Sequence, residues 1–203
     1  MNLPNKLTLF RIILVPIMVI IPYLGLQGEI LNIPITMLII DAIFIIASIT
    51  DKLDGTLARK NDQITTFGKF LDPIADKILV LAAMIMLVDF GKIPAWIPIV
   101  ILFREFVVSG YRLIAVQEKG EVIAASKWGK IKTVTQMLAI IMTFLDNYSF
   151  VEFIFGAEIT GFALVFNILT SAMMFICVIS TIFSGYEYLK SGKDLLLKDN
   201  EKV

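Results

Sequence analysis

Four aspartates between residues 51 and 76 carry the strongest chemical signal in this sequence: Asp51, Asp54, Asp72 and Asp76. Residues three or four apart share a face of a helix, so Asp51 pairs with Asp54, and Asp72 pairs with Asp76 on the face that Gly68 begins. Carboxylates held this close together repel each other unless cations or protons compensate their charge. The cluster therefore predicts a site for divalent metal ions.

Histidine is absent from the sequence, which limits the chemistry further. The chain cannot use a Ser-His-Asp or Cys-His mechanism, a histidine metal ligand or a phosphohistidine intermediate. Acid–base work must fall to carboxylates or lysine, and oxygen-only ligands favour Mg²⁺ or Mn²⁺, with Ca²⁺ as an alternative, over zinc or copper. Because such hard ions pair with phosphates, a phosphate-containing substrate is expected.

The composition places this cluster in a membrane protein. The chain of 203 residues is 58% hydrophobic, against roughly 45–50% for soluble domains. Apolar stretches, most of them close to the ~20 residues that cross a bilayer, lie near residues 12–26, 34–50, 72–90, 94–116, 131–145 and 159–183. We predict an all-α, polytopic membrane protein with six transmembrane helices. Pro16 and Pro22 interrupt the first stretch and no convincing cleavage site follows it, so it is expected to stay as an anchor.

The basic residues predict the orientation of these helices. Sixteen of the eighteen Lys and Arg lie in residues 1–11, 51–77, 112–132 and 184–203, which an even number of spans places on one side. Since basic residues are retained on the cytoplasmic side, both termini and the aspartates are expected there. The net charge of zero suggests no nucleic-acid partner.

The sequence indicates a single domain over residues 1–203. It contains no clear repeat, low-complexity tract or Gly/Ser linker, and only about residues 190–203 form a polar tail, expected to be dispensable for chemistry. The single cysteine, Cys177, lies within the last apolar stretch, where a small apolar packing role is expected.

The aspartates belong to a longer pattern that resembles the complete signature of the CDP-alcohol phosphotransferases: Asp51-x2-Asp54-Gly55-x2-Ala58-Arg59-x8-Gly68-x3-Asp72-x3-Asp76. Shorter patterns resemble the bacterial phosphatidylglycerophosphate synthases of that family: Asn5-x2-Thr8-x2-Arg11, Arg104-Glu105 and Lys127-x2-Lys130-x-Lys132-Thr133. The resemblance implies a multi-pass enzyme of the bacterial cytoplasmic (inner) membrane, with its active site facing the cytoplasm and a homodimeric assembly.

The resemblance also implies roles for the signature residues. In a two-metal site, ions about 3.5–4 Å apart clamp a transferring phosphoryl group. Asp51, Asp54 and Asp72 suit the ligand role, and the resemblance implies that Asp76 both touches a metal and removes the proton from the acceptor alcohol as general base.

Further residues of these patterns suit a CDP-lipid. Gly55 removes a Cβ where a nucleotide must approach, and Gly68 leaves room in the same way. Arg59 can bind a phosphate with two hydrogen bonds, and the resemblance implies a hydroxyl contact from Thr65. For Asn5 and Thr8, with Arg11, a cytidine or diphosphate role stands beside a simpler alternative, a capped and interface-anchored helix start.

Basic residues offer a place for an acceptor phosphate: Arg104, Arg112, Lys127, Lys130 and Lys132. The alternative is that they attract anionic lipid headgroups, each by roughly 1 kcal/mol. Arg104 and Glu105 are neighbours whose side chains point about 100° apart on a helix, so they are not expected to satisfy each other fully. Both could instead brace a polar cavity through hydrogen bonds, and Asp41 is expected to hydrogen-bond between helices.

These observations predict an enzyme that transfers the phosphatidyl group of CDP-diacylglycerol to sn-glycerol 3-phosphate, giving phosphatidylglycerophosphate and CMP, with two Mg²⁺ or Mn²⁺ ions. One alternative is a sibling enzyme that uses phosphatidylglycerol, inositol phosphate or serine as acceptor. A multi-span transporter is a more remote alternative, because its ion-coupling residues belong near the bilayer midplane, where only Asp41, Arg104 and Glu105 fit.

Overall fold

A computed structural model describes residues 3–60, 66–119, 127–155 and 158–198 of the chain. Within these ranges, the structure does not describe the side chains of residues 3–4, 52–60, 66–70, 72, 113–119, 155 and 191–198.

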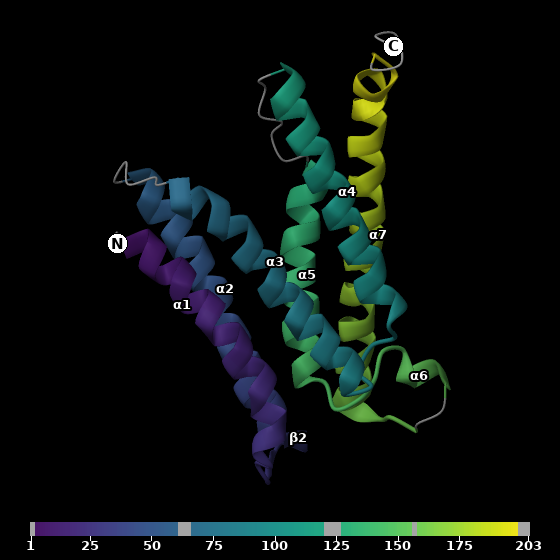
Figure 1. Ribbon diagram of the computed structural model, residues 1–203. Helices are drawn as coiled ribbons and strands as arrows, with labels where there is room; N and C mark the ends of the chain where they lie inside the picture. The colour runs from purple at the N-terminus through teal and green to yellow at the C-terminus, as the bar shows by residue number, and fades with distance from the viewer. Residues whose placement is uncertain (1–2, 61–65, 120–126, 156–157, 199–203) are drawn as a thin grey trace. The chain divides into compact units, whose positions relative to one another are not determined.

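The described chain is mostly helical (Figure 1). Its elements in order are α1 (Leu3–Ile20), the 3₁₀ helix η1 (Ile21–Leu24), β1 (Glu29–Ile30), β2 (Ile33–Pro34), α2 (Ile35–Lys60), α3 (Thr66–Asp89), α4 (Trp96–Lys119), α5 (Lys127–Leu145), α6 (Glu152–Phe155) and α7 (Gly161–Lys198). Each of the six predicted apolar stretches overlaps a different long helix, so the helical class is confirmed.

A short hairpin and a one-turn helix were not predicted. Strands β1 and β2 form an antiparallel hairpin in which Ile30 pairs with Ile33. Leu31 and Asn32 between them have φ angles of 55° and 64°, the left-handed pair that a two-residue hairpin turn requires. The other addition is α6, a single turn of four residues.

Two helices in the described ranges are long and apolar enough to cross a membrane. They are Asn5–Leu24, which joins α1 to η1, and Gly161–Lys190 within α7. α1 remains helical through Pro16. The apolar segment that was expected to stay as an anchor is therefore one of the two candidate spans.

The chain divides into two compact units. The first unit comprises Met1–Pro94 and Ile140–Thr170, and the second comprises Ala95–Ala139 and Ser171–Val203. The first unit contains α1, α2 and α3, and the second contains α4, while α5 and α7 contribute to both.

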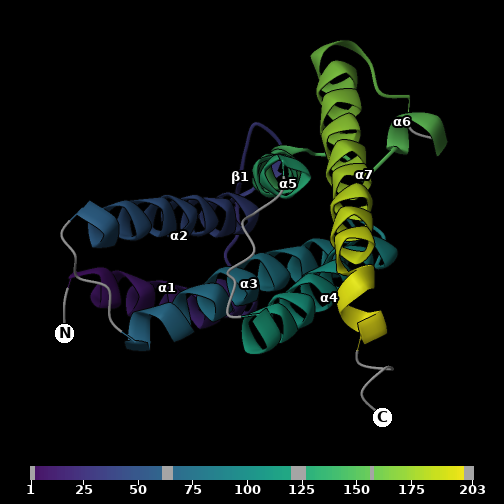
Figure 2. The ribbon, with the colours of Figure 1, turned by 90° about the horizontal axis from the view of Figure 1, so that it is seen from above.

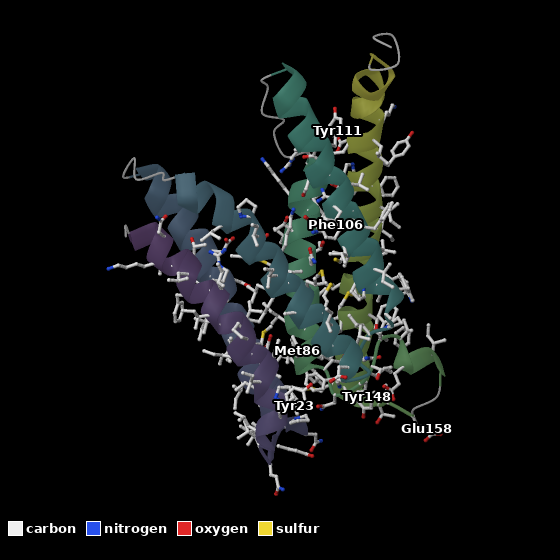
Figure 3. The ribbon with its side chains drawn as sticks, viewed as in Figure 1. Tyr23, Met86, Phe106, Tyr111, Tyr148 and Glu158 are labelled. Carbon is white, nitrogen blue, oxygen red and sulfur yellow. The ribbon has the colours of Figure 1, made fainter. Side chains whose placement is uncertain are left out.

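In the first unit, α1 packs against both α2 and α3. Figures 1 and 2 show α1 running beside α2. The buried side chains of these helices include Met18, Ile40, Phe44, Leu79 and Met84. Met86 of α3, labelled in Figure 3, is buried too. This apolar core fixes the helices on which the predicted aspartates lie.

The first unit contains a cluster of hydrogen-bonded polar residues around Lys92, Asp146 and Asn167. The ammonium group of Lys92 donates a hydrogen bond of 2.7 Å to the carbonyl oxygen of Asp146. The side-chain amide of Asn167 donates to Asp146 Oδ2 at 2.9 Å and to the carbonyl of Ser149 at 3.0 Å. Burial lowers the pKa of Lys92, while the nearby carboxylates of Asp146 and Glu152 act in the opposite direction. These hydrogen bonds join the loop after α3 to the segments around α6.

Replacing Asn167 by alanine should lower the free energy of unfolding by about 1–3 kcal/mol, because it leaves a buried oxygen of Asp146 without its donor. Unfolding in detergent micelles, followed by circular dichroism, measures this. Asn147→Ala is the matched control, since Asn147 is exposed and its amide donates one bond of 3.2 Å, to the carbonyl of Leu31. Equal losses in the two variants would contradict the assigned role of Asn167.

Candidate active site

The four predicted aspartates lie on two helices of the first unit. Asp51 and Asp54 belong to the C-terminal half of α2, and Asp72 and Asp76 belong to the N-terminal half of α3. Helix α2 continues about ten residues beyond its apolar stretch, and α3 begins about six residues before its own. The polar signature is therefore carried mainly on regular helices, and the carboxylate side chains that the structure describes are those of Asp51 and Asp76.

Helix α1 contributes a buried polar face to the same unit. Asn5, Thr8 and Arg11 are spaced three residues apart, and their exposed fractions are 8%, 1% and 0%. Asn5 lies inside α1, which begins at Leu3. An interface-anchored helix start would leave Arg11 in contact with solvent, so the burial of all three side chains favours a role in a site.

Arg11 is bound to the first aspartate of the signature. One of its terminal nitrogens lies 2.5 Å from Asp51 Oδ1, and the Asp51 side chain is 34% exposed. This ion pair joins α1 to α2. The sequence placed Arg11 in a motif but gave it no partner, because helical spacing relates residues within one helix only.

The donor chemistry of this unit fits hard metal ions. Asp51 and Asp76 offer carboxylate oxygens on α2 and α3, both of which pack on α1, and the chain holds no histidine. Among the side chains that the structure describes, no group of three carboxylate, cysteine or histidine residues could hold a metal ion. The side chains that the structure describes do not include those of Asp54 and Asp72, two of the four predicted ligands.

The residues predicted to bind the nucleotide are placed only by their backbone. Gly55 and Arg59 belong to α2, and Gly68 belongs to α3. Thr65 lies outside the described residues, as do the side chain of Arg59 and the surroundings of the two glycines.

In the second unit, two of the predicted basic residues, Arg104 and Lys132, contact the carboxylate of Glu105. Arg104 donates a 3.0 Å hydrogen bond to Glu105 Oε1, and Lys132 Nζ lies 2.5 Å from the same oxygen. Arg104 also donates to the hydroxyl of Ser184. The neighbours Arg104 and Glu105 thus contact each other directly, and each also contacts a further residue, so the two do not satisfy each other fully, as predicted.

Arg112 has a partner that the sequence did not indicate. Its terminal nitrogen donates a 2.6 Å hydrogen bond to the hydroxyl of Tyr188 on α7. Tyr188 lies 76 positions away in the chain, and nothing in its local sequence distinguishes it from a tyrosine at a membrane interface. Lys127 and Lys130, in the first turn of α5, are exposed.

Comparison with known proteins agrees with the signature. A model of the family described as CDP-alcohol phosphatidyltransferase matches residues 1–183 of the chain. The chain belongs to this family. It is therefore an enzyme of the CDP-alcohol phosphatidyltransferase class, and together with the two apolar helices this membership indicates a membrane-embedded enzyme.

Three relatives cover nearly the whole chain. A protein of Bacillus subtilis is 43% identical over 206 residues, which span 98% of this chain and 99% of the relative. A protein of Haemophilus influenzae is 37% identical over 97% of this chain and 96% of its own. A protein of Rickettsia bellii is 38% identical over 95% of this chain and 96% of its own. Each is named CDP-diacylglycerol–glycerol-3-phosphate 3-phosphatidyltransferase.

For this CDP-alcohol phosphatidyltransferase, Arg11→Gln should lower the free energy of unfolding by about 1–3 kcal/mol. Removing one partner of a buried ion pair is costly, and the partial exposure of Asp51 reduces that cost. Asp51→Asn should then cost less in the Arg11→Gln background than in the native protein, with a coupling of at least ~0.5 kcal/mol. Unfolding in detergent micelles containing EDTA measures this cycle without divalent ions.

Lys6→Gln serves as the control for the loss of charge, because Lys6 is an exposed cation of α1. It should change the free energy of unfolding by less than about 0.5 kcal/mol. Strictly additive effects of the Arg11 and Asp51 substitutions would show that the two side chains do not interact.

Proposed function

We propose that this enzyme transfers the phosphatidyl group of CDP-diacylglycerol to sn-glycerol 3-phosphate, giving phosphatidylglycerophosphate and CMP. The observation that carries this proposal is the agreement between the complete aspartate signature and relatives named for that activity, which are 43% and 37% identical over nearly their whole length. The polar face of α1 beside the first aspartate supports it, since a phosphate-rich substrate needs cations and donors.

The four aspartates are the proposed holders of two Mg²⁺ or Mn²⁺ ions: Asp51, Asp54, Asp72 and Asp76. Carboxylates on an otherwise apolar chain without histidine suit these hard ions. When bound, the ions would neutralise the diphosphate and the charge that develops on its oxygens. Arg11 would keep Asp51 close to α1 through their ion pair.

Asp76 is the proposed general base. It would remove the proton from the primary hydroxyl of glycerol 3-phosphate, and that oxygen would attack the β-phosphorus in line. The bond between the β-phosphorus and the bridging oxygen breaks, and CMP leaves with the bridging oxygen and its electron pair. A single displacement of this kind needs no covalent enzyme intermediate.

The CDP-lipid would be held by the remaining signature residues and by the start of α1: Gly55, Arg59, Thr65, Gly68, Asn5 and Thr8. Arg59 would bind a phosphate through its planar pair of donors. The acceptor phosphate would be bound by basic residues of α4 and α5: Arg104, Arg112, Lys127, Lys130 and Lys132. Three of these are already held by contacts within the second unit, which limits the entropy lost on binding.

The proposed setting is the cytoplasmic (inner) membrane of a bacterium. Six spans with both termini in the cytoplasm would place sixteen of the eighteen basic residues on the cytoplasmic side. A homodimer is proposed on the resemblance to the family. Labelling of single cysteines introduced near each terminus, in a Cys177→Ala background, would test the orientation.

The purified enzyme should release CMP from CDP-diacylglycerol when sn-glycerol 3-phosphate and Mg²⁺ or Mn²⁺ are present, and EDTA should abolish the release. Offering phosphatidylglycerol, inositol phosphate and serine to the same preparation tests the acceptor. Turnover with one of these and none with glycerol 3-phosphate would overturn the proposed acceptor.

Asp76→Asn should reduce turnover by about 10²–10⁴-fold, because the amide cannot accept the proton of the acceptor. Binding of CDP-diacylglycerol should be largely retained, as measured by equilibrium binding of a labelled CDP-lipid in detergent. Asp89→Asn is the control, since Asp89 is an exposed aspartate at the other end of the same helix. Near-normal turnover of Asp76→Asn would exclude Asp76 as the essential base.

A further inference from the structure

Tyr188 of α7 lies against two arginines of α4, Arg104 and Arg112. The centre of its ring is 5.7 Å from Cζ of Arg104 and 5.2 Å from Cζ of Arg112. Arg112 in addition donates its 2.6 Å hydrogen bond to the Tyr188 hydroxyl. A single buried side chain thus contacts two guanidinium groups that are eight residues apart on α4.

The ring of Tyr188 is held firmly in place. Its side chain is buried, with 4% exposure, in a cluster with Val108 and Tyr111. The rings of Tyr111 and Tyr188 meet edge to face, with centroids 6.4 Å apart and an angle of 66° between their planes. Figure 3 labels Tyr111 on α4. This packing makes Tyr188 a rigid support rather than a group that follows the arginines.

The same face of α7 also fixes Arg104. Ser184 and Gly185 lie four and three residues before Tyr188, which is one helical turn. The Ser184 hydroxyl accepts a hydrogen bond from Arg104. A Cβ added at Gly185 would lie 3.3 Å from Cγ of Arg104, so the glycine leaves room for that side chain. Ser184, Gly185 and Tyr188 of α7 therefore surround and position the Arg104 side chain.

Two guanidinium groups at one ring are a repulsive arrangement that needs compensation. The negative face of an aromatic ring attracts cations, which offsets part of the repulsion. Glu105 supplies a carboxylate, but Arg104 and Lys132 share one of its oxygens. Within the described part of the chain, Nε of Arg104 and Nε of Arg112 are buried and have no hydrogen-bond partner. Both arginines thus retain a buried donor for an anion.

We propose that Tyr188 is a positioning residue for the acceptor: it holds Arg104 and Arg112 ready to bind a phosphate monoester and so sets the affinity for that group. This inference rests on the proposed function, because it takes the acceptor phosphate as the anion. The alternative source of phosphate is the diphosphate of the CDP-lipid, and separate kinetics for the two substrates distinguish them.

Tyr188→Phe keeps the ring and removes the hydroxyl that Arg112 uses. The KM for glycerol 3-phosphate should rise about 2–10-fold, which corresponds to one lost hydrogen bond of this kind. Tyr188→Leu removes the ring as well, and the rise should be larger, about 10–100-fold. In both variants kcat and the KM for CDP-diacylglycerol should stay within about twofold of the native values, since P–O bond breaking is untouched.

Inorganic phosphate provides a second readout, independent of the glycerol moiety. It should inhibit competitively against glycerol 3-phosphate, and its inhibition constant should rise by the same factor as the KM in each Tyr188 variant. Tyr111→Phe is the matched control, because Tyr111 belongs to the same buried cluster and its ring contacts Tyr188. It should leave both KM values and the inhibition constant unchanged.

The possible failures can be told apart. If the native enzyme releases no CMP with glycerol 3-phosphate, the proposed function fails. If it does, and Tyr188→Phe and Tyr188→Leu leave the KM for glycerol 3-phosphate unchanged, the positioning role is overturned while the function stands. A rise confined to the KM for CDP-diacylglycerol, or an equal rise in both KM values with a lowered melting temperature, also overturns it. Tyr188→Phe keeps the test decisive if Tyr188→Leu does not fold.

Discussion

The guanidinium group of Arg11 has no solvent exposure in the first unit. The carboxylate of Asp51, 2.5 Å away, stabilises this buried charge. An unpaired buried charge would cost several kcal/mol. This pairing constrains much of the unit: α1 must present Arg11 toward α2, and α2 must remain helical beyond its apolar stretch as far as residue 51. The apolar packing of α1 on α2 and α3 supplies the rigid support on which the aspartate signature lies.

The cations of the second unit also need partners that compensate their charge, and different groups supply them. Arg104 and Lys132 share Glu105, while Arg104 and Arg112 share the ring of Tyr188. Both units therefore hold charged side chains in place before any substrate binds. Such preorganisation is what phosphate chemistry requires, because positioning and electrostatic stabilisation supply most of its catalysis. A membrane enzyme gains further, since charges held in a low dielectric interact strongly.

Much of the fold could be predicted from the sequence. Apolar runs indicated all six long helices, because a long apolar segment has few alternatives to a helix. The ends of α2 and α3 were harder to predict, because the polar signature residues that extend these helices are not part of an apolar stretch. The hairpin before α2 was missed because it depends on the left-handed backbone of Leu31 and Asn32, residues that favour this conformation less than glycine does. The burial of Asn5, Thr8 and Arg11 also had to come from the structure, because their spacing suited a helix cap equally well.

By itself, the sequence determined the family and the class of enzyme. The aspartate signature, the missing histidines and the basic residues depend only on residue type and local spacing, and they sufficed for the family and for the proposed reaction. The tertiary structure decided the partners: Asp51 for Arg11, Glu105 for Lys132, and Tyr188 for Arg104 and Arg112. The physical reason is that helical periodicity assigns a residue to a face of its own helix, whereas its contacts depend on how neighbouring helices rotate and pack. Arg112 and Tyr188, 76 positions apart, meet only when α4 and α7 pack together.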